Sequence, residues 1–566
     1  MRDVLSMFRA LAVGLALACL WHCSNRPTEV AGGGGGSEAV ALVGTVTNPD
    51  GSAAANALVR LRPKHFLSDT AAIGGGSETA GMTASIRNVR TDAAGAFRMD
   101  SVKRGEYFVE ISDSAGRGVL LPAVIAGDKD QVGLAKASLK PTGSVTGAIV
   151  PPEGFAGRTW VQVYGLERQV KADSATGSFR VDGMPGGTYT LRAVYSAPAV
   201  DAREIDSVSA VPDSITDIGA LRLASFENEN YAAWPGSKRL YLNTTAAGAN
   251  VPGSVDDFPV LVRLDASNFN FAESNGNDIR FSDAQGKRLR YEIERWDSEA
   301  GRAEIWVRVD RVQGNANAQF LTLHWGVPKA ESFSDGRQVF NAGTGFAGVW
   351  HLGEYAADTT TSDLYQDAVG YDPASDRTAS ADRGGVAGHG AGFGGTDYIA
   401  APVADPLLQP NALITVSAWM RGTRSGLLGG TLATMGDSYN LRVNPNGTGR
   451  FSIFNGDAPL GVESAKGAMS LLDSAWHHLA GVYDGSTLSL YIDGKPAGKA
   501  SAKGAIDYRY SPAFVMGKHG NRKTGYEFLG SLDEVEVSGE VARSADWIKL
   551  AYENQREGAK LVEFRP

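Results

Sequence analysis

Near the C-terminus, two runs of alternating apolar and polar residues predict two strands, each closed by a turn. Side chains alternate between two faces over residues 476–483 and again over residues 487–492. Each run is closed by an Asp-Gly pair, Asp484-Gly485 and Asp493-Gly494. Such a pair between alternating runs favours the tight turn of a hairpin, because its residues tolerate the left-handed backbone that the turn needs. Each run therefore predicts a strand, and each pair predicts a turn.

Short alternating runs separated by Gly, Asn and Asp recur along most of the chain, as at residues 258–265, 278–282, 289–296 and 303–310. Long amphipathic helical patterns are absent outside the first 25 residues. We therefore expect an all-β chain, and its 566 residues suggest about four domains. Trp306 lies on the polar face of the last run. We expect it to pack against a neighbouring strand or domain, with a role as a sugar platform as the alternative.

Residues 40–135 and 138–223 share one plan, which indicates an internal duplication. The segment Asp92–Phe97 of the first recurs in the second as Asp173–Phe179, with nearly the same spacing of Asp, Gly and Phe. Gly95 permits a backbone bend that a side chain would obstruct. Neither copy carries a cluster of titratable residues, so we expect both to act as spacers.

Several segments resemble known β families. The two repeats resemble the regulatory-like sandwich first described in carboxypeptidases. Residues 224–335 resemble an uncharacterised β domain that often precedes laminin-G-like jelly rolls in bacterial surface proteins. Residues 336–566 resemble that laminin-G-like, or concanavalin-A-like, jelly roll through segments 350–354, 393–399 and 530–535. The resemblance implies tandem β-sandwiches ending in a concanavalin-A-like jelly roll, a fold that hosts lectins, glycosidases and spacers alike.

The N-terminus carries signals for export and anchoring. Residues 11–20 form an apolar run that is too short to span a bilayer, which needs about 20 apolar residues. Cys19 lies near the end of this run and Cys23 follows it, which resembles a bacterial lipoprotein signal. We expect residues 1–23 to be the signal segment, with lipid on Cys23, and residues 24–39 to be a Gly-rich tether. An ordinary cleaved signal is the alternative. The chain would be exported to the outer membrane or cell surface and would meet the membrane only through its lipid.

Composition and motifs exclude some classes of function. The net charge of −9 with no basic stripe argues against a nucleic-acid partner. We expect no catalytic residues, because the chain has no Gly-x-Ser-x-Gly elbow and no Glu-x-Asp-x-x-Glu strand of the kind that glucanases on the jelly-roll fold carry. Glu534 and Glu536 come nearest, on a strand face that we expect to be solvated. Adjacent His477 and His478 point to opposite faces of a strand, which argues against zinc.

The jelly-roll resemblance implies a structural calcium ion at a loop rim. Asp367 and Asp372 match two aspartates of the family's loop, although Pro373 replaces the usual Gly, and Asp533 matches the closing strand. Calcium takes six to eight oxygen ligands, and carboxylates are among the best. The alternative is that these carboxylates only cap loops and turns.

These features favour a non-catalytic binding protein of the cell surface, with a polysaccharide or surface glycan as its partner. Sugar sites pair aromatic faces with a few polar groups. The apparent loops of the jelly roll offer Tyr365, Tyr371, Tyr439 and Tyr526 for this role. Two alternatives stay open: a structural or adhesive protein that binds another protein, and a glycan-active enzyme whose catalytic residues are not recognisable.

Overall fold

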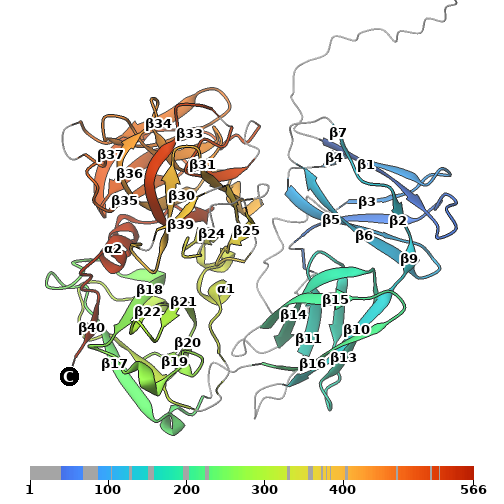
Figure 1. Ribbon diagram of the computed structural model, residues 1–566, viewed down its shortest axis with the longest axis horizontal. Coiled ribbons are helices and arrows are strands. Elements are labelled where there is room, and N and C mark those ends of the chain that lie inside the picture. The colour runs from blue at the N-terminus through green and yellow to red at the C-terminus, as the bar shows by residue number, and fades with distance from the viewer. Residues whose placement is uncertain are drawn as a thin grey trace, which may run out of the picture. The chain divides into compact units, whose positions relative to one another are not determined.

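The protein is described by a computed structural model, which is all-β apart from a few short helices (Figure 1). The described residues are 40–64, 66–67, 87–102, 105–125, 131–150, 159–195, 203–223, 229–327, 330, 332–354, 361–370, 374–377, 379–382, 384–401, 406–466, 470–509, 513–521 and 523–565. The predicted signal segment with Cys23, the predicted tether, Tyr371 and Asp372 lie outside them. No helix within these ranges is both long and apolar enough to cross a membrane.

The first repeat is a sandwich of two sheets around one core. One sheet has the order β4-β1-β7, with β8 also paired to β1, and the other has the order β3-β2-β5-β6-β9. Phe97, Tyr107 and Ile111 are buried between them. The strands are β1 (Val40–Thr47), β2 (Leu58–Pro63), β3 (Arg87–Arg90), β4 (Ala96–Val102), β5 (Gly105–Ser112), β6 (Arg117–Ile125), β7 (Gln131–Gly133), β8 (Ala137–Ser138) and β9 (Lys140–Pro141).

The second repeat has sheets of order β13-β10-β16 and β12-β11-β14-β15. Its strands are β10 (Gly143–Val150), β11 (Thr159–Val163), β12 (Arg168–Lys171), β13 (Ser178–Met184), β14 (Gly187–Tyr195), β15 (Arg203–Ala210) and β16 (Ile215–Arg222). In each repeat the first strand pairs antiparallel on one side and parallel on the other. This shared pairing supports the predicted duplication.

Equivalent glycines explain the shared Asp-to-Phe segment. Gly95 and Gly177 have φ angles of +73° and +70°. A Cβ atom would lie 2.2 Å from the carbonyl oxygen of Val46 in the first repeat and 2.0 Å from that of Ile149 in the second. Only glycine fits both the left-handed backbone and this close approach.

The third unit is another pair of sheets, with the orders β20-β19-β23-β17-β40 and β18-β22-β21. Its strands are β17 (Gly236–Leu242), β18 (Val255–Asp265), β19 (Ile279–Ser282), β20 (Arg288–Leu289), β21 (Tyr291–Asp297), β22 (Arg302–Val312), β23 (Phe320–Trp325) and β40 (Val562–Phe564). The four strands predicted here from alternation are present.

The jelly roll consists of two eight-stranded sheets. Their orders are β27-β28-β39-β30-β35-β36-β37, with β24 beside β39, and β25-β26-β29-β38-β31-β32-β33-β34. The predicted hairpin is β35–β36, followed by β37. The elements are α1 (Gly336–Val339), β24 (Phe346–Trp350), β25 (Thr361–Tyr365), β26 (Ala374–Arg377), β27 (Ser380–Asp382), β28 (Gly390–Gly394), β29 (Tyr398–Ala400), β30 (Ile414–Ser425), β31 (Gly430–Met435), β32 (Tyr439–Val443), β33 (Gly449–Phe454), β34 (Pro459–Glu463), β35 (His477–Tyr483), β36 (Thr487–Ile492), β37 (Lys495–Ser501), β38 (Phe514–Met516), β39 (Phe528–Gly539) and α2 (Ala545–Gln555).

The hydrophobic core of the third unit extends beyond residue 335, beside a separate core inside the jelly roll. Phe258 and Trp306 of the third unit pack in a cluster with Phe340, Phe346 and Trp547 from beyond residue 335. The C-terminal strand β40 returns to pair with β17, as the dark red and green ribbons of Figure 1 show. The core of the third unit therefore contains residues from both sides of the predicted boundary at residue 335. Trp306 has no exposed surface, which confirms that it packs rather than serving as a sugar platform.

Candidate functional site

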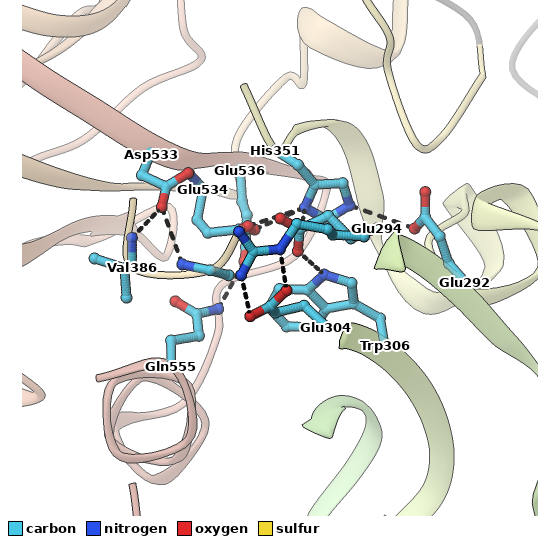
Figure 2. A network of polar contacts seen from close by, with 12 residues as sticks. Glu292, Glu294, Glu304, Trp306, His351, Val386, Asp533, Glu534, Glu536 and Gln555 are labelled. Atoms are coloured by element: carbon cyan, nitrogen blue, oxygen red, sulfur yellow. Dashed lines mark hydrogen bonds and ion pairs between the residues drawn. The ribbon is translucent and has the colours of Figure 1, made fainter. Parts of the chain in front are cut away.

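A histidine with carboxylates on both ring nitrogens lies where the third unit meets the jelly roll (Figure 2). His351 directly follows β24, and its Nδ1 is 2.9 Å from Oε2 of Glu534 on β39. On β21, Oε2 of Glu292 is 3.3 Å from His351 Nε2, and Oε2 of Glu294 is 4.0 Å from Nδ1. We call these four residues the carboxylate–histidine centre.

Two β-bulges aim carboxylates into this centre. On β21, Ile293 and Arg295 pair with neighbouring residues of β22, so Glu294 is an extra residue between them. On β39, Glu534 has a φ angle of +47°, at a shift in its register with β30. A bulge re-aims a side chain that strict alternation would send to the other face. The positive φ of a bulky residue is unusual and marks Glu534 as a constrained position.

Aromatic rings form one wall of the centre. The indole of Trp306 stacks on the imidazole of His351, with centroids 5.5 Å apart and planes 22° apart, and its Nε1 donates to Glu294 Oε2 at 2.8 Å. The ring of Phe340 contacts His351 edge-on at 5.6 Å. Because these rings exclude water, charges in the centre are poorly screened.

The neighbouring arginines bind other groups. Arg295 donates to both carboxylate oxygens of Glu304, at 2.6 and 2.7 Å. Arg263 donates to the backbone carbonyls of Val386, Asn554 and Gln555. Neither guanidinium donates a hydrogen bond to Glu294 or Glu534, although the charge of Arg263 helps to lower the pKa of Glu534.

Burial and mutual repulsion set the charges of the centre. Burial alone would lower the pKa of His351, but the carboxylates of Glu534 and Glu292 raise it well above its usual value. Burial, reinforced by the charge of Glu534, raises the pKa of Glu294 to about 8. Burial also raises the pKa of Glu534, although His351 opposes that shift. The centre therefore holds protons near neutral pH.

The adjoining carboxylates of β39 are buried as well. Glu534 and Glu536 are 1% and 4% exposed, so the expectation of a solvated strand face is wrong. Glu536 accepts from Gln555 of α2 at 3.1 Å, and burial raises its pKa to about 7. The reason is tertiary: α2 and the third unit cover the sheet face that an isolated jelly roll would expose.

A cleft opens onto one side of the centre. Its lining includes Glu292, Glu294, His351, Glu354 and His389. Glu534 is not part of that lining. Small solutes can therefore approach Glu294 and His351 from the cleft, whereas Glu534 lies behind them.

One imidazole and two carboxylates are a donor set that binds divalent transition metals. Glu294, His351 and Glu534 each offer one ligand atom, and these three atoms lie within 4.8 Å of one another. Within the described ranges, this is the one such group of three or more. The same three side chains can alternatively form a closed ion-pair network.

The tyrosines predicted to bind a ligand have different environments. Tyr365 and Tyr439 are fully buried in the jelly-roll core, and Tyr439 donates to the carbonyl of Leu408 at 3.0 Å. Their rings offer no face to a ligand, which corrects the expectation for these two residues. Tyr526 is half-buried beside Arg442 and His519. Tyr371 lies outside the described residues.

The aspartates predicted to hold calcium bind backbone amides where they are described. Asp367 Oδ1 accepts from the amides of Val349 and Val369, at 2.8 and 3.0 Å. Asp533 Oδ2 accepts from Val386 and Ala387, and burial raises its pKa well above the usual value. These contacts are those of capping carboxylates. Since Asp372 lies outside the described residues, the calcium site stays a prediction.

The adjacent histidines point to opposite faces, as their strand position predicts. His477 bonds Asp493 at 2.9 Å and Asp473 at 3.1 Å. His478 packs against the rings of Trp419 and Tyr552. The metal-ligating candidate His351 went unnoticed in the sequence, where the one signal was its place beside Trp350 in a family motif.

Family models match two parts of the chain. Residues 275–352 match a model described as Domain of unknown function (DUF2341). Residues 393–549 match one described as Concanavalin A-like lectin/glucanases superfamily, so the C-terminal part is a concanavalin-A-like domain. The first match contains Glu292, Glu294 and His351, and the second contains Glu534. No curated protein matches the chain.

Solved structures resemble parts of the chain at low identity. The binding domain of Paraclostridial Mosquitocidal Protein 1 is 12% identical with a TM-score of 0.30, over 36% of this chain and 52% of that one. Domain 4 of AbnA, a GH43 extracellular arabinanase from Geobacillus stearothermophilus in complex with arabinotriose, is 16% identical with a TM-score of 0.27, over 33% and 92%. A heptameric SAP-like pentraxin from Limulus polyphemus is 16% identical with a TM-score of 0.22, over 28% and 78%.

Proposed function

We propose that this chain is a non-catalytic binding protein of the cell surface, exported and anchored through lipid on Cys23, which binds a glycan through its C-terminal jelly roll. The concanavalin-A-like match supports a binding role. The surroundings of Tyr526 carry the proposal for a glycan. The two N-terminal sandwiches act as spacers between the anchor and the binding part.

Tyr526 combines an aromatic ring with polar groups. The guanidinium carbon of Arg442 is 5.1 Å from the centroid of its ring, and the imidazole of His519 is 5.1 Å away. Close by, Asp437 accepts from Asn521 at 2.7 Å and from Lys523 at 2.6 Å. Sugar sites need such a ring face together with a few polar groups that select hydroxyls.

The Glu294–Glu534 pair is poorly placed for hydrolysis of a glycosidic bond. A glycosidase needs two carboxyl groups that both reach the scissile bond. Glu294 and Glu534 have oxygens within 4.8 Å of each other, but Glu534 is 1% exposed and does not line the cleft. A sugar in the cleft would meet one carboxylate of this pair and not the other.

A second candidate is adhesion to a protein. Leu427 and Leu428, in the turn between β30 and β31, are 90% and 53% exposed. The amide of Leu428 donates to the carbonyl of Gly525 at 2.6 Å, so the two leucines lie beside the loop of Tyr526. Exposed leucines at one turn are a feature of protein-binding surfaces.

A glycan array probed with the purified chain, in calcium and in chelator, tests the proposal. We expect binding to a defined set of glycans, loss of that binding in Tyr526→Ala, and retention in Tyr241→Ala. Tyr241 is a matched control because it is a half-buried tyrosine of the third unit with Arg565 over its ring at 4.2 Å. No binding to any glycan, or equal binding by both variants, would contradict a site at Tyr526.

Two further assays separate the alternatives. Beads coated with the chain should lose adhesion to bacterial cells after periodate destroys the vicinal diols of surface sugars. Adhesion that survives periodate and is lost in Leu427→Ser with Leu428→Ser would favour a protein partner. The glycans that bind should also yield no reducing sugar over time. Steady release that Glu294→Gln or Glu534→Gln abolishes would show an enzyme.

A further inference from the structure

The carboxylate–histidine centre contains a buried oxygen with no partner. The side chain of Glu294 is 5% exposed, and its Oε2 accepts from Trp306, but its Oε1 has no hydrogen-bond partner. A buried polar atom without a partner costs free energy. The structure holds Glu294 there nonetheless, on a bulge that aims it at His351 and Glu534.

A glycine preserves the space beside that oxygen. Gly388 has a φ angle of +58°, and a Cβ atom there would lie 2.2 Å from Glu294 Oε1. Gly388 also lines the cleft. The free oxygen, Glu294 Oε1, therefore faces the space that a side chain at position 388 would fill. Solutes can reach this space from the cleft.

The contacts of His351 match the outer shell of a metal site. A ligating histidine usually donates its second ring N–H to a carboxylate, which fixes the ring and its tautomer. Here Nδ1 faces Glu534 and Glu294, while Nε2 is 3.3 Å from Glu292. Glu292 thus occupies the outer-shell position for a histidine that binds a metal through Nδ1.

We propose that Glu294, Glu534 and Nδ1 of His351 bind one divalent transition-metal ion of the zinc class. The imidazole favours zinc and similar transition metals over calcium, magnesium and manganese, which suit oxygen ligands. The ion takes the place of the hydrogen between Nδ1 and Glu534, and that proton leaves to solvent together with any proton held by the carboxyl groups of Glu294 and Glu534. Three protein ligands leave one coordination position for water from the cleft.

Small movements complete the coordination. Ligands about 2.0–2.2 Å from a tetrahedral zinc ion lie about 3.3–3.6 Å apart. The distance from His351 Nδ1 to Glu534 Oε2 is 2.9 Å and must lengthen, and the distance from Nδ1 to Glu294 Oε2 is 4.0 Å and must shorten. Each change is less than about 1 Å. Because Glu294 belongs to the third unit and the other two ligands to the jelly roll, the ion would join these two parts of the surface protein.

Metal titration of the full chain tests the site. After treatment with chelator, the chain is titrated with Zn²⁺ and with Co²⁺, and bound metal is measured by mass spectrometry together with the visible absorption of cobalt. We expect one tight equivalent that raises the melting temperature. Glu294→Gln, which keeps an acceptor for Trp306, should lose this equivalent. Glu292→Gln should weaken it about 10–100-fold.

His477→Gln is the matched control, because His477 is also buried between two carboxylates but belongs to no group of three metal ligands among the described residues. It should bind the ion as the unchanged chain does. All variants keep Cys19 and Cys23, so metal bound there cancels in the comparison. Equal metal content, cobalt spectrum and melting shift in the unchanged chain and in Glu294→Gln would overturn the proposal and leave a closed ion-pair network.

Discussion

Glu294 and Glu534 are placed by β-bulges on two different sheets, and side-chain oxygens of both lie within 4.8 Å of a ring nitrogen of His351. Neither strand would present its carboxylate here with a regular register. The centre therefore depends on local irregularity in two strands and on the packing that brings the third unit against the jelly roll.

Without metal, Glu534 is the closest partner of His351, and its loss should be costly. Glu534→Ala leaves a buried histidine without its 2.9 Å partner, which should lower the free energy of unfolding by about 3–5 kcal/mol. Denaturant unfolding in chelator, followed by tryptophan fluorescence, measures this loss. Glu463→Ala is the control, because Glu463 pairs with Arg450 at the surface and is 41% exposed, so about 0–1 kcal/mol is expected. Similar losses in both variants would contradict this description of the centre.

The adjacent histidines should give opposite pH dependences. Burial against Trp419 and Tyr552 lowers the pKa of His478 to about 4, so the folded chain holds it neutral while the unfolded chain binds a proton near pH 6.5. Its contribution to stability is present above pH 6.5 and falls by on the order of 3 kcal/mol as the pH drops toward 4. His478→Phe should flatten the melting temperature over this range. An unchanged acid slope in the variant would count against a neutral His478.

For His477 the sign is reversed. Burial opposes its charge, but the hydrogen bonds that its ring donates to Asp493 and Asp473 raise its pKa above 6.5. The stabilisation is complete below pH 6.5 and is lost as the pH rises through the raised pKa. His477→Gln should therefore destabilise the chain most at mildly acidic pH and least at alkaline pH. A destabilisation that grows as the pH rises would refute this assignment.

The repeated glycines make a separate prediction. Gly177→Ala must adopt a positive φ and must also push away the carbonyl of Ile149, 2.0 Å from the added Cβ. Gly219→Ala, in the same sandwich, has a positive φ but no atom within 4 Å of its Cβ. Backbone strain alone costs about 1–3 kcal/mol. The fluorescence of Trp160 during denaturant unfolding should show a clearly larger loss for Gly177→Ala, and equal losses would show that the carbonyl contact has no cost.

Anchoring can be tested in cells. Cys23→Ala should move the protein from the membrane fraction to the soluble exported fraction, because the polar tether begins directly after Cys23. Cys19→Ala should leave it in the membrane fraction. Release by Cys19→Ala alone would shift the lipid to that residue, and release by neither variant would rule out the lipid anchor.

Much of the fold could be predicted because alternation and turn residues act locally. The strand at residues 303–310 and the Asp484-Gly485 hairpin are determined by neighbours in sequence, and both are present. Period-two alternation also showed that His477 and His478 point to opposite faces. These features need no knowledge of what packs on the sheet.

The site could not be predicted in the same way. Alternation places Glu534 and Glu536 on one face, but it cannot show that α2 and the third unit cover that face. A bulge also interrupts the alternation from which the face of each side chain is predicted. The direction of the Glu294 side chain could therefore not be predicted from the sequence. The prediction that Tyr365 and Tyr439 bind a ligand was wrong for a related reason. A tyrosine beside a turn can still point into a core.

The most direct test of the proposed metal site is an anomalous diffraction experiment at the metal edge, on crystals of the full chain grown with Zn²⁺ or Co²⁺. We predict one strong anomalous peak between His351 Nδ1 and the carboxylates of Glu294 and Glu534, with Glu292 bonded to Nε2. The peak should vanish in Glu294→Gln and persist in His477→Gln. Ordered density for all four side chains with no anomalous peak among them would contradict the central claim.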